Sequence, residues 1–213
     1  TGINSKSNNP KTGDMIQIWI MSRNVAPHDA VKSLDDRSVC GECPLRPSRY
    51  KKLRMAKKCY VETWQAPLAI FKAYHRGNYE TVTPEQFRTK IQGKSVRLGA
   101  YGDPASVKFE FWESIGVGSG EFKHTGYTHG YLLPNFDNRH LQFNMISLDP
   151  VTEQMDNVPN GRSFRVINSV DEVRSDEIIC PASEEGGHKT TCEKCLLCSG
   201  SEIQAKNVAI VIH

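Results

Sequence analysis

Short apolar runs alternate with segments of helical periodicity along most of this chain. The alternation begins at residue 15 and continues to residue 213. The eight runs that we predict to be strands span residues 15–21, 58–62, 95–101, 122–129, 143–149, 163–168, 177–180 and 207–213. Residues 1–14 are polar and lack an apolar period, so we expect a flexible tail followed by a single domain over residues 15–213.

Helix signals lie between several of these runs. Thr83 is placed as an N-cap before Pro84, and Gln86 stands three residues after the cap. Residues 65–76 have the apolar spacing of a core-facing helix. Gly77 and Gly93 stand where two of these helices are expected to end, as a left-handed cap requires.

Alternating strands and helices predict an α/β fold with a parallel sheet. Eight strands suit a full or partial (β/α) barrel of the TIM type, and an open doubly wound sheet is the alternative. In both architectures, functional groups gather at the carboxyl ends of the strands. Five polar residues end or directly follow predicted strands and are expected on one rim: Asp103, His129, Asp149, Asn168 and Cys180.

Among these rim residues, Asp103 and His129 are the candidate catalytic side chains. Both Asp103 and Asp149 precede a proline, so each also has an alternative role as a helix cap. His124 and His129 are five apart, which puts them on opposite faces of a strand, and at most one is expected to face a pocket. The candidate cofactor-binding residues are Gly99, Tyr101, Gly102 and Asn168, since small residues permit a ligand to approach the backbone.

The seven cysteines fall into two groups within a chain of 213 residues. Their odd number and the lack of a signal-like segment argue against a disulfide scaffold. No window approaches the roughly 18 apolar residues of a membrane span, so we expect no membrane partner and a cytoplasmic location. No phosphate loop, dinucleotide fingerprint or nucleophile elbow is present.

The group nearer the C-terminus, here called the second cysteine group, consists of Cys192, Cys195 and Cys198, spaced C-x2-C-x2-C, with Cys180 upstream. Four thiolates bind either a [4Fe-4S] cluster or a tetrahedral zinc ion. The close spacing resembles the first three cluster ligands of bacterial ferredoxins and favours iron and sulfide, although zinc stays an alternative.

The group nearer the N-terminus, here called the first cysteine group, consists of Cys40, Cys43 and Cys59, which supply three thiolates. A cubane held by three cysteines leaves one iron open to a substrate or to S-adenosylmethionine. A zinc ion at the same place would need a histidine such as His75 or His28.

Seven basic residues lie in the segment between and beside these cysteines. The whole chain carries a formal net charge of only +3, so this positive charge is concentrated in one segment. Such a cluster is typical of phosphate contacts with a nucleic acid or a nucleotide, and a solvated basic loop is the alternative. The residues are Arg46, Arg49, Lys51, Lys52, Arg54, Lys57 and Lys58.

Several of these motifs together resemble a family of uncharacterised phage and mobile-element proteins related to radical S-adenosylmethionine barrels. The motifs are Cys43-Pro44, Cys59-Tyr-Val-Glu62, Tyr101-Gly-Asp-Pro104, His124-Thr-Gly-Tyr-Thr-His129 and Cys180-Pro-Ala-Ser183 with the cysteine run. The resemblance spans residues 15–213 and implies a βα barrel, two clusters and a phage origin, hence the host cytoplasm. The usual triad of those enzymes is C-x3-C-x2-C, whereas fifteen residues separate Cys43 from Cys59 here.

We therefore predict an iron-sulfur protein, either a radical S-adenosylmethionine-like enzyme or a degenerate relative. On this hypothesis the first cysteine group holds the reducible cluster, the second holds an auxiliary cluster, and the substrate is a nucleic acid or nucleotide. The alternative is a non-enzymatic zinc or iron-sulfur protein that binds nucleic acid or a host protein.

Overall fold

The computed structural model describes residue 3, residues 9–46 and residues 59–212. Within these residues, eight short strands form two sheets, and every strand pair is parallel. The strands are β1 (Ile16–Trp19), β2 (Val96–Tyr101), β3 (His124–Thr125), β4 (Tyr127–Thr128), β5 (Met145–Leu148), β6 (Ser163–Ile167), β7 (Glu177–Ile179) and β8 (Asn207–Val211). The α/β class predicted from the sequence is therefore confirmed.

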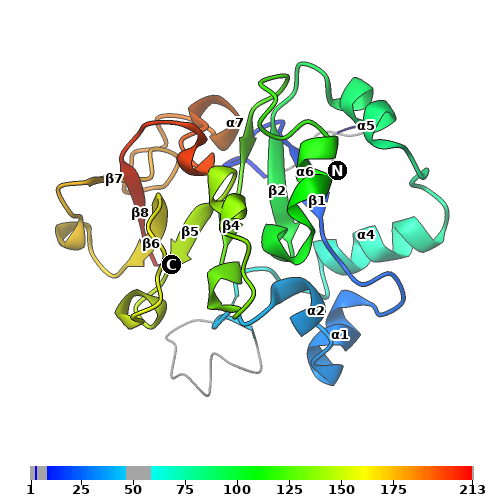
Figure 1. The fold of residues 1–213 in the computed structure, drawn as a ribbon, viewed down its shortest axis with the longest axis horizontal. Coiled ribbons are helices and arrows are strands. Elements are labelled where there is room, and N and C mark those ends of the chain that lie inside the picture. The colour runs from blue at the N-terminus through cyan, green and yellow to red at the C-terminus, as the bar shows by residue number, and fades with distance from the viewer. Residues whose placement is uncertain (1–2, 4–8, 47–58, 213) are drawn as a thin grey trace.

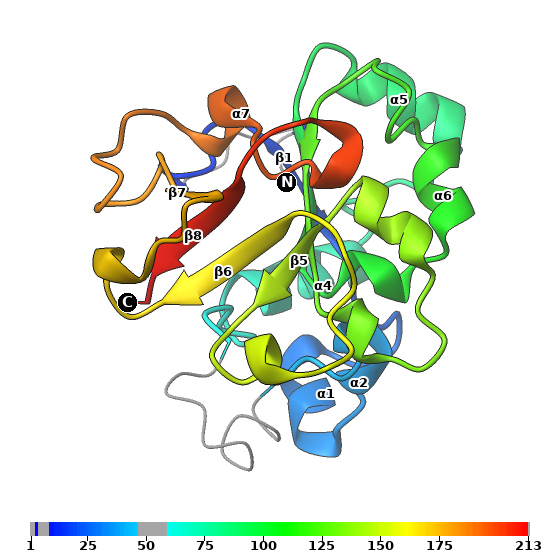
Figure 2. The same cartoon turned by 60° about the vertical axis from the view of Figure 1, so that its left-hand side comes forward.

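One sheet has the order β1-β2-β3 and the other β4-β5-β6-β8-β7. Only Gly126 separates β3 from β4, so chain continuity joins the two sheets edge to edge. In Figure 2, β5, β6 and β8 lie side by side with their arrowheads pointing away from α7. The strand order is sequential from β1 to β6, but β8 then inserts between β6 and β7, unlike the strictly sequential order of a TIM barrel.

The helices are short, and those near β1 and β2 lie on the right of Figure 1, with α1 and α2 below the sheets. No helix in the described part of the chain is long and apolar enough to cross a membrane. The α-helices are α1 (Pro27–Ser33), α2 (Arg37–Cys40), α4 (Ala66–His75), α5 (Pro84–Ile91), α6 (Phe109–Ser114) and α7 (Cys192–Cys195). The 3₁₀ turns are η1 (Pro104–Ser106), η2 (Gly130–Leu132), η3 (Asn138–Gln142), η4 (Thr152–Gln154), η5 (Val170–Glu172) and η6 (Gly200–Glu202).

The helix signals in the sequence act as predicted around α4 and α5. Thr83 Oγ1 accepts a hydrogen bond from Gln86 N, and Gln86 Oε1 accepts one from Thr83 N, which completes a capping box. Gly77 and Gly93 follow these two helices with φ angles of +78° and +74°. Glycine adopts this left-handed conformation without steric cost, so both helices end there.

A hydrophobic core joins the first sheet to α5 and α6. Val96 and Leu98 of β2 are fully buried in it, together with Trp112 of α6. The indole N–H of Trp112 donates a 2.9 Å hydrogen bond to Pro104 O, so the core also fixes the turn that follows β2. Arg97, between the two core residues of the strand, points to the opposite face.

The structure corrects three parts of the sequence prediction. Residues 59–62 are irregular, so the described part of the 58–62 segment is not a strand. Residues 122–129 contain two strands, because Gly126 N bonds to Cys198 O instead of continuing the first ladder. Residues 9–14 of the predicted tail pack on the fold: Thr12 is buried, and Asp14 N donates a 2.9 Å hydrogen bond to Glu193 Oε2.

The close approach of Gly102, after β2, to Ile20, after β1, can be tested by substitution. Gly102 has a φ of +80°, and a methyl group there would lie 2.5 Å from Ile20 O and 2.8 Å from Ile20 Cβ. Gly77 has a similar φ of +78° but no atom within 4 Å of that position. We expect Gly77→Ala to lower the unfolding free energy by about 1 to 2 kcal/mol through φ strain. We expect Gly102→Ala to lower the unfolding free energy by about 1 to 3 kcal/mol more than Gly77→Ala does, because the added methyl group overpacks the turn.

Urea denaturation of both glycine variants measures this difference, with Gly77→Ala as the matched control. Equal losses in the two variants would show that β1 and the turn after β2 do not approach each other as described.

Candidate active site and cysteine centres

The buried carboxylate of Asp103 joins segments that end β2 and β4. Its Oδ1 accepts hydrogen bonds of 2.7 Å from Thr128 Oγ1 and 2.9 Å from Ala105 N. Its Oδ2 accepts a 2.7 Å hydrogen bond from the backbone N–H of His129. The capping role that the sequence left open for Asp103 is therefore confirmed, and the same carboxylate positions His129.

His129 and Asp149 form a buried ion pair at the same rim. His129 Nε2 lies 3.4 Å from Asp149 Oδ2, longer than a good N–H···O bond of about 2.7 to 3.2 Å. Burial opposes charge on His129, but negative charge at Cys43 and the Asp149 carboxylate raise its pKa to about 10. Asp149 Oδ1 accepts bonds of 3.0 and 3.1 Å from Val151 N and Thr152 N, so its predicted capping role is also confirmed.

His124 lies away from this pair, in the core of the first sheet. Its Nε2 is 3.1 Å from Phe143 O, and the side chain is 1% exposed. Burial lowers the pKa of His124 to about 4, so its imidazole is neutral at pH 7. Only one of the two histidines in this segment reaches the rim, as their spacing predicts.

Helix α2 brings the first cysteine group to the carboxyl ends of the strands. Asp103 N donates a 2.6 Å hydrogen bond to Val39 O, and Ser106 Oγ donates to the same carbonyl at 2.9 Å. Cys40 follows Val39 as the last residue of α2, and Cys43 N donates a 3.2 Å hydrogen bond to Cys40 O. These contacts anchor the start of the cysteine loop directly on the Asp103 turn.

The remaining member of this group, Cys59, returns to the same loop. Its N–H donates a 2.8 Å hydrogen bond to Leu45 O. Burial raises the pKa of Cys40, and negative charge at Cys43 and Cys59 raises it further. Burial also raises the pKa of Cys59 to about 11, partly offset by a hydrogen bond from Val61 N. Burial and the charge of neighbouring cysteines thus act together on the pKa of Cys40 and of Cys59. That the three thiols bind one metal centre stays a prediction.

The histidine beside this group is His129. Negative charge on Cys43 is the largest influence that raises the pKa of His129. The sequence instead suggested His75 or His28 as the histidine of a zinc site. His75 is exposed, with Nε2 3.0 Å from Arg23 O, and His28 lies in α1. The structure thus points to a different candidate ligand, which arrives from β4.

The second cysteine group packs against the five-stranded sheet. Cys180 follows β7, and the loop that carries Cys192, Cys195 and Cys198 lies beside it. Cys180 and Cys198 are buried in one hydrophobic cluster, and Cys192 packs against it. Burial raises the pKa of Cys198 to about 12, with further contributions from negative charge at the other three cysteines. Three of the four cysteines thus share one apolar cluster, and their role as ligands of a common metal stays a prediction.

The charge of Arg97 acts on a cysteine of each group, and no pattern in the sequence indicated this role. Its Nη2 donates a hydrogen bond to Tyr60 Oη, next to Cys59. Burial raises the pKa of Cys192, and the positive charge of Arg97 partly offsets that increase. Arg97 also partly offsets the raised pKa of Cys59. The Nε atom of Arg97 is buried and has no hydrogen-bond partner among the described residues.

All seven cysteines are described, and all are free thiols. As the side chains stand, no three His, Cys, Asp or Glu residues in the described chain are arranged to hold one metal ion. Zinc with Zn–S bonds of about 2.3 Å requires sulfurs within about 4 Å of one another. A cubane holds its cysteines farther apart, because iron and sulfide atoms lie between them.

The predicted cofactor-binding residues take different roles. A methyl group on Gly99 would lie 2.6 Å from Gly102 O, so the protein's own turn fills the space expected for a ligand. Asn168 is exposed, and its Nδ2 donates a 3.2 Å hydrogen bond to Glu172 Oε1. Tyr101 is buried near the first cysteine group, and its hydroxyl has no partner among the described residues. Tyr101 alone keeps a geometry suited to ligand contact.

Arg46 has a structural role, which corrects its assignment to a phosphate-binding surface. The guanidinium is buried, with Nε 3.0 Å from Asp36 Oδ2 and Nη2 2.7 Å from Asp36 Oδ1. Its Nη1 donates a 2.9 Å hydrogen bond to Gly41 O, so it braces the loop before Cys43. The other basic residues of that prediction lie outside the described residues: Arg49, Lys51, Lys52, Arg54, Lys57 and Lys58.

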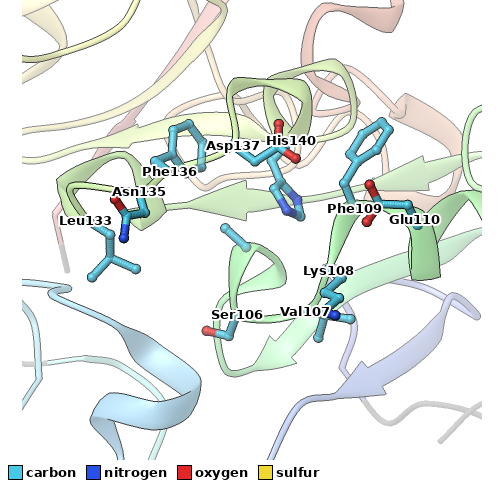
Figure 3. Close-up of a pocket in the computed structure, with 11 residues that line it drawn as sticks. Ser106, Val107, Lys108, Phe109, Glu110, Leu133, Asn135, Phe136, Asp137 and His140 are labelled. Carbon is cyan, nitrogen blue, oxygen red and sulfur yellow. The ribbon is translucent and has the colours of Figure 1, made fainter.

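A cleft of about 240 Å³ lies on the other side of the Asp103 turn (Figure 3). Its walls come from residues 105–110 and 133–140, and the imidazole of His140 points between them. The buried Nδ1 of His140 has no hydrogen-bond partner in the described chain. No cysteine lines this cleft, so it does not mark the cysteine centre. The contacts at the strand ends define the candidate site instead.

Comparison of the chain with known protein families, curated proteins and solved structures found no match. The resemblance stated above therefore stays a prediction that rests on the motifs alone.

Because the His124 imidazole is buried and neutral, we expect the unfolding free energy to fall in acid. The folded protein keeps this imidazole neutral down to a pH of about 4, whereas the unfolded chain binds a proton below about 6.5. The resulting stability is complete above pH 6.5 and is lost as the pH falls toward 4. Between pH 7.5 and 5, the wild type should lose about 2 kcal/mol more unfolding free energy than His124→Gln.

Urea unfolding at both pH values measures this difference, and the variant controls for all other titrating groups. Parallel losses in the two proteins would contradict the neutral buried state of His124.

Proposed function

We propose that this chain is an iron-sulfur enzyme of the radical S-adenosylmethionine type, or a degenerate relative with a barrel-like fold. One observation carries the proposal: Val39 O, beside Cys40 at the end of α2, accepts a hydrogen bond from Asp103 N at the carboxyl end of β2, and Asp103 also binds the backbone N–H of His129. Cys43 and Cys59 are held in the loop that follows, through Cys40 O and Leu45 O. They lie between β1 and β2 in the chain, so the loop after the first strand would hold the reactive centre. Parallel α/β folds place their active sites at this edge.

The polar atoms around this group support a ligand site. Tyr101 Oη, His129 Nε2 and Asp149 Oδ2 are buried and lack a good hydrogen bond within the described residues. Buried polar atoms without partners are costly, so they mark places where a bound group adds stability. All three belong to strand ends at the same rim.

A cluster with an open iron would supply one-electron reduction of S-adenosylmethionine. The protein's own residues would do the rest. Tyr101 would donate a hydrogen bond to a ligand bound beside Cys40, and Asp149 would hold His129 in position. Arg97, between the two cysteine groups, offers a positive charge toward an anionic part of the substrate.

The second cysteine group would hold an auxiliary cluster with Cys180, Cys192, Cys195 and Cys198 as ligands. Its thiols are buried against apolar side chains, which suits a centre that does not contact substrate. A nucleic acid or nucleotide substrate remains the proposal, as do phage origin and the host cytoplasm. They rest on the sequence motifs and on basic residues outside the described chain.

Zinc at the first group is the second candidate, and the position of His129 favours it. Three cysteines with one histidine form a common structural zinc site. With zinc there, the protein would be a non-enzymatic module that binds nucleic acid or a host protein.

Metal analysis of paired variants separates these functions. Protein prepared without oxygen should contain about eight irons and eight sulfides per chain, four for each cubane. Replacing Cys40, Cys43 and Cys59 together by Ala should remove about half of the iron, and replacing Cys192, Cys195 and Cys198 by Ala should remove the other half. Each triple variant is the matched control for the other.

Activity then identifies the reactive centre. With dithionite as reductant, the wild type and the second-group variant should cleave S-adenosylmethionine to methionine and 5′-deoxyadenosine, whereas the first-group variant should not. Zinc without iron in the wild type would favour the binding module. Iron retained by both triple variants would refute the assignment of the ligands.

A further inference from the structure

Three lysines surround a cleft beside the second cysteine group. The cleft has a volume of about 590 Å³, which is within the range of about 300 to 1,000 Å³ typical of small-molecule sites. It lies next to α7, which is labelled in Figure 2. Its lining residues are Pro10, Lys11, Ala182, Ser183, Glu184, His188, Lys189, Thr190, Thr191 and Lys194.

The side chains that line this cleft carry a net positive charge. Lys11, Lys189 and Lys194 form no salt bridge with any carboxylate of the described chain. Glu184 is the one acidic residue among the lining side chains, so three positive charges and one negative leave +2. Lysines that are spread over a surface usually find partners or point apart, whereas these three face one hollow.

Thr191, one of the residues that line the cleft, carries a buried hydroxyl group that is unsatisfied within the described chain. Thr191 Oγ1 is buried and has no hydrogen-bond partner among the described residues. Ser183, which lines the same cleft, shows the contrast, because its Oγ donates a 2.9 Å hydrogen bond to Cys180 O. A buried hydroxyl without a partner costs folding free energy unless a ligand or a water molecule accepts a hydrogen bond from it.

The loop that carries Lys189 is held in a strained form. His188 has a φ of +46°, a left-handed conformation that is uncommon for a residue other than glycine. Two backbone hydrogen bonds of 2.9 Å hold the strained residue in place, from His188 N to Ser183 O and from Lys189 N to Pro181 O. Strained residues fixed by their surroundings concentrate at ligand sites.

The cysteine loop fixes the other two lysines. Cys192 N donates a 2.8 Å hydrogen bond to Lys11 O, which ties the N-terminal segment to this loop. Lys194 lies in α7 between Cys192 and Cys195. The conformation of the cysteine loop therefore sets the spacing of the cationic groups across the cleft.

We propose that this cleft binds phosphate groups. Lysine ammonium groups are strong point-charge partners of phosphate, and the Thr191 hydroxyl adds a neutral donor. A net charge of +2 suits a ligand with at least two negative charges. Such a ligand is either a small phosphorylated molecule or the backbone of a nucleic-acid strand. This inference does not rest on the proposed radical chemistry.

Two probes test the proposal on the full chain. Calorimetry measures binding of inorganic pyrophosphate, and fluorescence anisotropy measures binding of a short labelled oligothymidine at low salt. We expect the wild type to bind at least one of them. The triple variant K11Q/K189Q/K194Q should bind it at least about tenfold more weakly. Thr191→Val should weaken binding less and leave its salt dependence unchanged.

The matched control is K72Q/K108Q/K123Q, which removes the same charge from exposed positions elsewhere. Its affinity should equal that of the wild type. Pyrophosphate binding identifies a small phosphorylated ligand, and binding of the strand alone identifies nucleic acid. The proposal is overturned if neither probe binds the wild type, or if the two triple variants lose affinity equally.

Discussion

The candidate site depends on the buried carboxylate of Asp103, which ties two strand ends and a helix to one point. Its oxygens accept hydrogen bonds from Thr128 Oγ1, Ala105 N and His129 N, and its own N–H donates to Val39 O. A buried carboxylate is costly without such partners, so the four bonds leave little freedom to the segments that make them. His129 and the start of the cysteine loop therefore approach each other in one arrangement.

The second constraint is electrostatic. Burial raises the pKa of the Cys40 and Cys59 thiols in the first group and of the Cys192 and Cys198 thiols in the second, and negative charge on neighbouring cysteines raises these pKa values further. Among the described residues, the positive charge of Arg97 opposes this rise at Cys59 in one group and at Cys192 in the other. Neutral thiols satisfy this environment, and so does a bound metal centre, which supplies the missing positive charge.

Local signals explain which features the sequence predicted. Strand ends are marked by Asp-Pro turns and by glycines, so the rim and its polar residues emerged from short patterns. The pairing of His129 with Cys43 was not predictable in this way, because it joins distant parts of the chain. Arg46 was misassigned because it stands at the start of a basic run, while its partner Asp36 lies ten residues upstream. The 58–62 segment was predicted as a strand because it contains a short apolar run, but the N–H of Cys59 bonds to Leu45 O instead of to a neighbouring strand.

X-ray diffraction from crystals grown without oxygen, recorded at the iron absorption edge, tests the central claim most directly. We predict an anomalous iron peak bounded by Cys40, Cys43 and Cys59 and adjacent to His129, with a second peak at Cys180 and the C-terminal cysteine run. An absence of iron at the first group, in protein that carries iron at the second, would contradict a reactive centre at the strand ends.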